Sequence, residues 1–266
     1  MATSSVKTQP PIIPDPPEEE GHALRMTLMD HLLELRNRLF KAMLALAVGT
    51  LLGFLVTEQV FVLLLEPARR IGIDALTTLA PTDSIVNYLR VSLLIGAILS
   101  VPMVTYQLLM FIVPGLTRRE RRVMLSSLPA VTGLFLVGVA FAWTILIPPA
   151  LDFLAGFQPQ IFKASWTADQ YLGFVTALLF WMGVAFQTPL IFFILSILGF
   201  VGPRTLVKQW RIAIVGSAIA AAIITPTVDP VNLFLVMGPL LTLYLFSIIL
   251  VFFGSRRFVP LPPEVG

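Results

Sequence analysis

Two glutamates stand among arginines at the edges of long apolar runs. Glu34 lies in "HLLELRNRL", residues 31–39, just before the first such run, and Glu120 lies in "GLTRRERRV", residues 115–123, between two others. A carboxylate can receive an arginine guanidinium through two parallel hydrogen bonds, a geometry that lysine does not reproduce. Two carboxylates at a membrane edge could therefore bind two guanidiniums. The alternative is that each forms only a local ion pair, as Glu34 and Arg38 can at i, i+4 on a helix.

The elements that carry these glutamates belong to a membrane protein. Of the 266 residues, 57% are hydrophobic and only 12% are charged, and the mean hydropathy is +0.89. Soluble domains carry roughly twice this charged fraction. A spanning helix needs about 20 apolar residues. The sequence therefore predicts an all-α membrane protein with six transmembrane helices, at residues 39–62, 88–113, 123–148, 170–198, 211–225 and 231–253.

Glycine and proline determine where several spans end or bend. The fourth span is expected to stop at Gly199, and the fifth is shortened by Pro226. A helix that ends before Pro226 spans only about 21 Å at 1.5 Å per residue, so a re-entrant or protein-buried half-helix is the alternative for this segment. Prolines in or beside most spans predict bent, tilted helices around a concave face.

The distribution of basic residues predicts the orientation. With six spans, fourteen of the 18 lysines and arginines fall on the side of both termini, which the positive-inside rule makes the cytoplasmic side. Residues 1–25 are rich in proline and acids and lack a signal-peptide apolar segment, so they are predicted to be a disordered tail. Residues 26–253 form the predicted membrane domain in the cell membrane, and 254–266 a cytoplasmic tail.

Several chemistries find no support in the sequence. There is no cysteine, both histidines precede the first span, and neither an H-E-x-x-H motif nor a P-loop occurs. We therefore expect no enzyme activity, no metal and no cofactor. Basic residues occur in short clusters between apolar runs, so no nucleic acid is expected as a partner. An ion- or solute-coupled transporter is the rival function, and it would depend on the polar residues Gln107, Gln187 and Asn232. A third possible function is that of a structural scaffold for other membrane subunits.

Two polar residues, Gln187 and Asp229, each have both a structural and a functional interpretation. Gln187, in "FQTP", could bind a partner or could satisfy the backbone carbonyl that Pro189 frees. Asp229, in "TPTVDP", could be a simple turn residue in a short hairpin or a functional acid on the outer side.

Four stretches together resemble the TatC family, the multi-span component of the twin-arginine protein translocase. They are "HLLELRNRL", "SVPMVTYQLLMFIVPGLTRRERR" at 100–122, "FQTP" at 186–189 and "TPTVDP" at 225–230, and the resemblance extends over roughly residues 26–253. It implies a receptor that binds the twin-arginine signal peptides of folded cargo proteins. It also implies single-span partner subunits resembling TatA and TatB, an oligomeric receptor complex in the lipid bilayer, and transport driven by the proton-motive force.

The resemblance also assigns roles to individual residues. Glu34 and Glu120 match the positions that recognise the arginine pair, and Arg36 and Arg121 match functional basic residues nearby. Phe111 and Pro67 match positions important for receptor function or architecture, and Asp229 matches an outer-side acid. Gln187 stands where many relatives carry an intramembrane glutamate, so only a hydrogen-bonding role, not a charge, carries over to it.

The implied mechanism places the signal peptide first on the two glutamates. Its apolar part would then insert along the concave face, and single-span partners would dock near the short fifth and sixth spans, where short helices could thin the bilayer. Six spans are few for passing a folded domain, so the chain alone is not expected to form the conduit.

Overall fold

The structure is a computed structural model that describes residues 28–73, 75–112, 118–161, 165–225, 227 and 229–258. Within these ranges, side chains are described except at 28–30, 112, 118–120, 123 and 254–258. The predicted tail 1–25 lies outside the described residues. The chain divides into two compact units, residues 1–37 and 38–266.

The described residues are almost entirely helical, which confirms the all-α prediction. Five helical segments are long and apolar enough to cross a membrane, namely His31–Arg70, Asp83–Phe111, Met124–Gly156, Ala168–Ile197 and Pro230–Phe253, and Trp210–Ile224 is a shorter apolar helix. The only β pairing among the described residues is an isolated bridge between Thr77 and Thr167. The predicted orientation of the termini and the concave face stay predictions.

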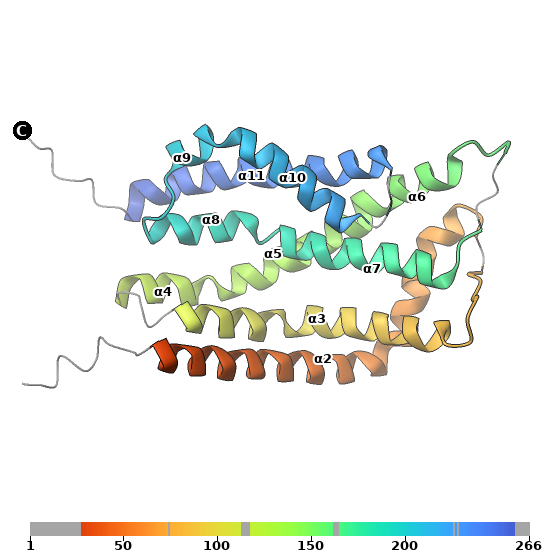
Figure 1. The fold of residues 1–266 in the computed structure, drawn as a ribbon, viewed down its shortest axis with the longest axis horizontal. Coiled ribbons are helices and arrows are strands. Elements are labelled where there is room, and N and C mark those ends of the chain that lie inside the picture. Colours follow the sequence, from red (N-terminus) through yellow and green to blue (C-terminus); the bar gives the residue numbers. More distant parts are fainter. Residues whose placement is uncertain are drawn as a thin grey trace, which may run out of the picture. The chain divides into compact units, whose positions relative to one another are not determined.

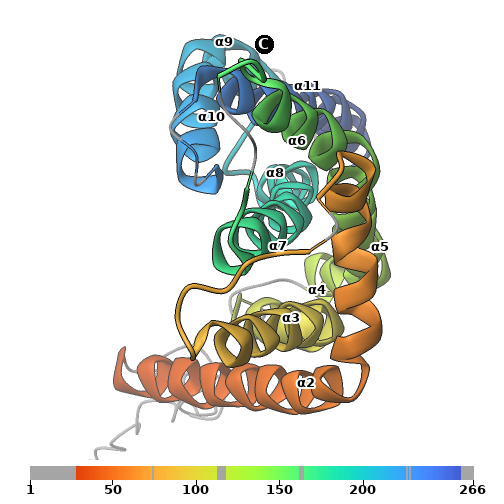
Figure 2. The same ribbon diagram turned by 90° about the vertical axis from the view of Figure 1, so that its right-hand side faces the viewer.

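The first two long helices are α2 (Leu28–Arg70) and α3 (Asp83–Ile112). Helix α2 extends beyond the predicted span at both ends, and its C-terminal half turns sharply away from its earlier course (Figure 2). Small residues bring α2 and α3 together: a Cβ atom added to Gly49 would lie 2.7 Å from the carbonyl oxygen of Gly96. Beside this contact, the hydroxyls of Thr57 and Ser92 are 2.7 Å apart.

A short helix, α4 (Arg118–Ser126), precedes the third span. That span is built from α5 (Leu128–Phe141), the π-helical turn η2 (Ala142–Leu146) and α6 (Ile147–Gly156). It extends past the predicted end at residue 148 because the two prolines of α6 lie in its first turn, where no intrahelical N–H donor is needed.

The fourth span is a broken helix. It consists of α7 (Ala168–Ala185) and α8 (Thr188–Ile197), and the break falls at Phe186 and Gln187, just before a proline in the first turn of α8. Gly199 follows α8 with φ of 79°, a left-handed conformation that glycine adopts without strain. The predicted stop at Gly199 is therefore confirmed, although the helix before it is not continuous.

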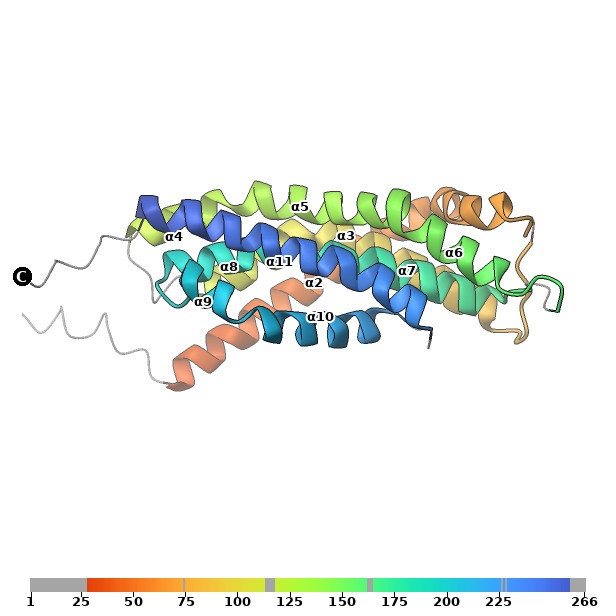
Figure 3. The same cartoon turned by 90° about the horizontal axis from the view of Figure 1, so that it is seen from above.

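The last helices are α9 (Pro203–Lys208), α10 (Trp210–Ile224) and α11 (Pro230–Phe258). Helix α10 ends as predicted, with Thr225 extended before the proline that follows it, since a residue before proline is disfavoured in the helical conformation. Helix α11 packs against both α8 and α10 (Figure 3).

The buried core of residues 38–266 is centred on α7. This helix packs against α3 and α5 (Figure 1). It buries Leu172, Val175 and Met182 completely. Helices α4 and α9 lie at one end of this unit, and the segment that leads into α7 lies at the other (Figure 1).

Candidate functional site

The arginine-rich segment forms the first turns of α4. Glu120 lies in this helix, whose sequence is RRERRVMLS, and Arg121 is exposed. The side chain of Glu120 lies outside the described side chains. Helix α4 packs against α3 and α5, so the end of α3, where Phe111 is half-buried, and the start of the third span hold it in place.

The other predicted guanidinium-binding residue lies in the first turns of α2. Glu34 is half-buried and Arg36 is exposed, with Nη2 of Arg36 3.4 Å from Oδ1 of Asn37. Glu34 and Arg36 are two positions apart, so on a helix they point in different directions and do not pair directly. The binding of two guanidiniums by Glu34 and Glu120 stays a prediction.

Gln187 lies at the break between α7 and α8. Its Nε2 donates a hydrogen bond to the backbone carbonyl of Val131 in α5, at 3.0 Å. This acceptor lies on another helix and is not the carbonyl that Pro189 frees, so the structural interpretation offered by the sequence is wrong in its detail. Oε1 of Gln187 is buried and has no hydrogen-bond partner among the described residues. The Gln187 side chain therefore joins the break between α7 and α8 to α5.

Asp229 caps the N-terminus of α11. Its Oδ1 accepts from the backbone N–H of Asn232 at 2.7 Å and its Oδ2 from the side-chain Nδ2 of the same residue at 2.9 Å. Burial raises the pKa of Asp229, but hydrogen bonds, above all those from the backbone and side chain of Asn232, outweigh burial and lower the pKa below its usual value. Asp229 is therefore held as a carboxylate at the start of the last span, and its role as a local turn residue is supported.

Pro67 is buried within α2, close to a contact with α7. The Tyr171 hydroxyl donates to the backbone carbonyl of Leu64 at 2.7 Å, and the Tyr171 ring stacks on Trp166 with 6.2 Å between centroids. This contact fixes the last turns of α2 against the start of α7, which is consistent with an architectural role for Pro67.

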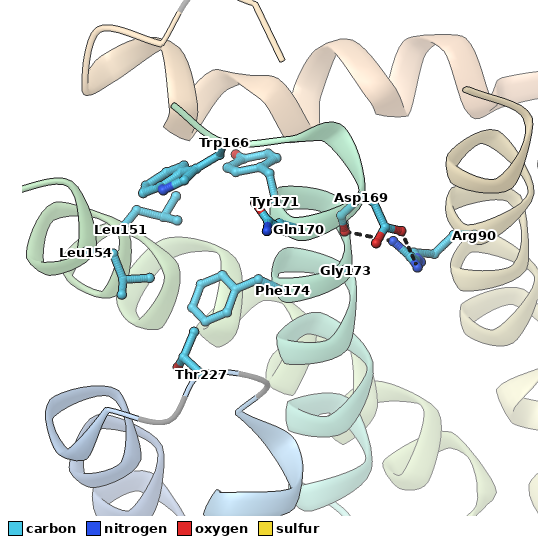
Figure 4. Close-up of a pocket in the computed structure, with 10 residues that line it drawn as sticks. All are labelled: Arg90, Leu151, Leu154, Trp166, Asp169, Gln170, Tyr171, Gly173, Phe174 and Thr227. Carbon is cyan, nitrogen blue, oxygen red and sulfur yellow. Dashed lines mark hydrogen bonds and ion pairs between the residues drawn. The ribbon is translucent and has the colours of Figure 1, made fainter. Parts of the chain in front are cut away.

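A cavity near the start of α7 was missed by the sequence reasoning. It measures about 500 Å³, and Figure 4 shows Trp166, Tyr171 and Phe174 around it, with Arg90 and Asp169 at its edge. Nη2 of Arg90 lies 2.9 Å from Oδ1 of Asp169, and Nη1 donates to the backbone carbonyl of Asp169 at 3.0 Å. The sequence did contain a signal for this pair. Arg90 lies inside one predicted span and Asp169 just before another, both toward the side predicted to be opposite the termini.

The polar residues that a small-solute transporter would need do not form one site. Nε2 of Gln107 lies 3.8 Å from the sulfur of Met103 on its own helix, whereas Gln187 bonds to α5 and Asn232 to Asp229. Among the described residues, no group of three or more His, Asp or Glu side chains is placed to hold a metal ion.

Comparison with known proteins identifies the family. The family model of the Sec-independent protein translocase protein (TatC) matches residues 30–239. The chain belongs to the TatC family.

Individual TatC proteins match over most of the chain. The chloroplastic TATC of Arabidopsis thaliana is 38% identical over 228 residues, which is 86% of this chain and 67% of that protein. The pea protein is 37% identical, and the match spans 62% of its length. The TatC of Synechocystis is 34% identical over 91% of this chain and 92% of that protein. A crystal structure of "Twin Arginine Translocase Receptor- TatC" is 33% identical, with a TM-score of 0.76 over 85% of this chain and 100% of that chain.

Proposed function

We propose that this chain is the receptor subunit of a twin-arginine translocase. It binds signal peptides that carry paired arginines, at a membrane-edge site containing Glu34 and Glu120. The observation that carries the proposal is the match to TatC over residues 30–239, a range that includes both glutamates. The similar crystal structure is itself described as a twin-arginine translocase receptor.

The proposed recognition depends on the geometry of carboxylate and guanidinium. Each glutamate accepts two parallel N–H donors from one arginine, and charge-assisted bonds of this kind are roughly twice as strong as neutral ones. A lysine ammonium is a point charge and does not reproduce the bidentate geometry, so it pairs less specifically. Arg36 and Arg121, both exposed, are proposed to help to orient the peptide.

Both termini are proposed to face the cytoplasm, because fourteen of the 18 basic residues then lie on that side. The site on α2 and α4 would thereby meet signal peptides before transport. The proposed location is the cell membrane, and the apolar part of the signal peptide would insert beside the bent helices.

Single-span partner subunits are proposed to dock near α10 and α11 in an oligomeric complex driven by the proton-motive force. Helix α10 has 15 residues, about 22 Å at 1.5 Å per residue, which is shorter than a hydrocarbon core of about 30 Å. This mismatch favours local thinning or association with other helices.

The double variant Glu34→Gln, Glu120→Gln tests the proposal. It removes both charges and keeps the side-chain size, so the protein is expected to fold and to lose export of twin-arginine substrates in cells. Glu66→Gln is the matched control, because Glu66 is an exposed glutamate of α2 at the opposite end of the helix, 3.9 Å from Arg70. Normal export by the folded double variant would contradict the proposed site.

A further inference from the structure

A groove opens between α8, α10 and α11. It holds about 290 Å³. Helix α11 contacts both α8 and α10 and forms its floor with Leu240 and Tyr244. The α10 wall presents small residues, Ala213, Gly216 and Ala220, and a Cβ atom added to Gly216 would meet nothing within 4 Å.

Two contacts hold the floor of the groove against α8 and α9. The Tyr244 hydroxyl donates to the backbone carbonyl of Leu206 in α9 at 2.6 Å. The Tyr244 ring meets Phe192 of α8 edge to face, with 5.9 Å between centroids. The groove is therefore a built feature of the packing of α8, α9 and α11, and its apolar lining suits a hydrocarbon chain.

Basic residues lie close in sequence to the end of the groove at which α9 meets α10. Gln209 lines this end, and the exposed side chains of Arg204, Lys208 and Arg211 lie within a few residues of it. The guanidinium carbon of Arg211 lies 5.6 Å from the ring centroid of Trp210, itself 53% exposed. Tryptophan with basic residues at a helix end is typical of the lipid headgroup region.

No acid among the described residues neutralises these three cations. The sequence contains no aspartate or glutamate between Asp169 and Asp229. Among the described residues, none of the three forms an ion pair. The positive charge at this end of the groove is available to an anionic ligand.

We propose that the groove binds one anionic phospholipid, with its phosphate headgroup at Arg204, Lys208 and Arg211 and an acyl chain between α8 and α10. A positive cluster at the mouth of an apolar groove matches a lipid that is anionic at one end and apolar at the other. The three cations favour a lipid, which is anionic at one end, over an apolar spanning helix. In the proposed orientation this lipid comes from the cytoplasmic leaflet.

Native mass spectrometry of the purified full-length protein measures this directly. Phosphatidylglycerol and phosphatidylcholine with identical acyl chains are titrated in turn. Each basic residue near an anionic headgroup contributes about 1 kcal/mol, a factor of about five in affinity. The wild type is expected to bind phosphatidylglycerol up to roughly 100-fold more tightly than phosphatidylcholine, and the triple variant R204Q/K208Q/R211Q to lose this preference. The matched charge control is R69Q/R70Q, which removes exposed arginines of α2 and should leave the preference intact.

A second pair of variants tests the groove itself. Gly216→Leu is expected to fill it and to weaken binding of both lipids at least tenfold. Gly238→Leu is the matched control, because a Cβ atom at Gly238 in α11 also meets nothing within 4 Å but Gly238 does not line the groove.

Three results would overturn the proposal. The first is equal binding of the two lipids by the wild type. The second is binding of soluble glycerol phosphate as tight as that of the lipid, which would indicate a free-phosphate site. The third is unchanged lipid binding by Gly216→Leu together with loss of a single-span partner, which would assign the groove to a helix.

Discussion

Gly96→Ala should separate α2 from α3. A Cβ atom at Gly96 would lie 2.5 Å from the backbone nitrogen of Thr50 and 2.6 Å from its Cα. Nine in ten real Cβ contacts are 3.4 Å or longer, so reaching an ordinary contact requires the helices to move apart by about 0.8–0.9 Å. The obstructing atoms are backbone, and no change of rotamer can relieve the clash.

The shift has a cost that can be worked out from the neighbouring contacts. Moving apart by this amount would stretch the bond between Thr57 and Ser92, 2.7 Å in the structure, to the limit of a hydrogen bond. Overpacking of this kind costs about 1–3 kcal/mol, against which alanine gains about 1 kcal/mol of helix propensity over glycine. Gly96→Ala should therefore lower the free energy of unfolding by up to about 2 kcal/mol.

Gly133→Ala is the matched control. Gly133 lies in α5, where an added Cβ meets nothing within 4 Å, so this variant should gain up to about 1 kcal/mol from propensity alone. Reversible unfolding in mixed micelles, followed by circular dichroism, compares the two. If Gly96→Ala proved as stable as Gly133→Ala, the close contact of α2 with α3 would be refuted.

Three other substitutions test separate parts of the account by the same unfolding measurement. Gln187→Glu should cost about 2 kcal/mol at neutral pH, because a carboxylate cannot donate to the Val131 carbonyl. The loss should shrink in acid, and a constant loss would contradict the assigned hydrogen bond. Asp229→Ala should cost about 1 kcal/mol as a lost helix cap. Because the folded pKa of Asp229 is lowered, its contribution is present above the unfolded value near 3.8 and disappears as pH falls through the folded pKa. Wild type and Asp229→Ala should then converge in strong acid, and a gap that persists there would argue against the cap. Tyr171→Phe should cost about 1 kcal/mol by removing the buried hydroxyl bond to α2, and an unchanged stability would contradict that bond.

The positions of the spans were predictable because the bilayer imposes a length and a composition. Long apolar runs bounded by charge identified five long segments and one short one, and Gly199 and Pro226 acted through simple backbone rules. Breaks within the helices were harder to predict from the sequence. The break at Gln187 depends on how α7 and α8 pack against α5 and α11, and that packing is not encoded in local sequence.

Some residues of the candidate site could likewise be predicted from the sequence, and others could not. Glu34 and Glu120 stood out because an acid among arginines at a membrane edge has no anchoring role. The Arg90–Asp169 pair did not, because its members are 79 positions apart and meet only when α3 packs against α7. The partner of Gln187 was mispredicted for the same reason: Val131 is 56 positions away. Contacts between residues far apart in sequence can be identified only once the fold is known, whereas acids among arginines at a membrane edge can be recognised in the sequence.

Photo-crosslinking beside Glu34 and Glu120 tests the central claim most directly. A photoreactive residue is placed in turn at Asn37 and Arg122, both exposed, so that both carboxylates remain, and the folded protein is offered a signal peptide with Arg-Arg or the same peptide with Lys-Lys. Strong adducts with Arg-Arg and weak adducts with Lys-Lys are expected, because only the guanidinium matches a carboxylate through two hydrogen bonds. Equal adducts with both peptides would reduce Glu34 and Glu120 to local ion-pair partners, and no adduct with either would contradict the receptor function itself.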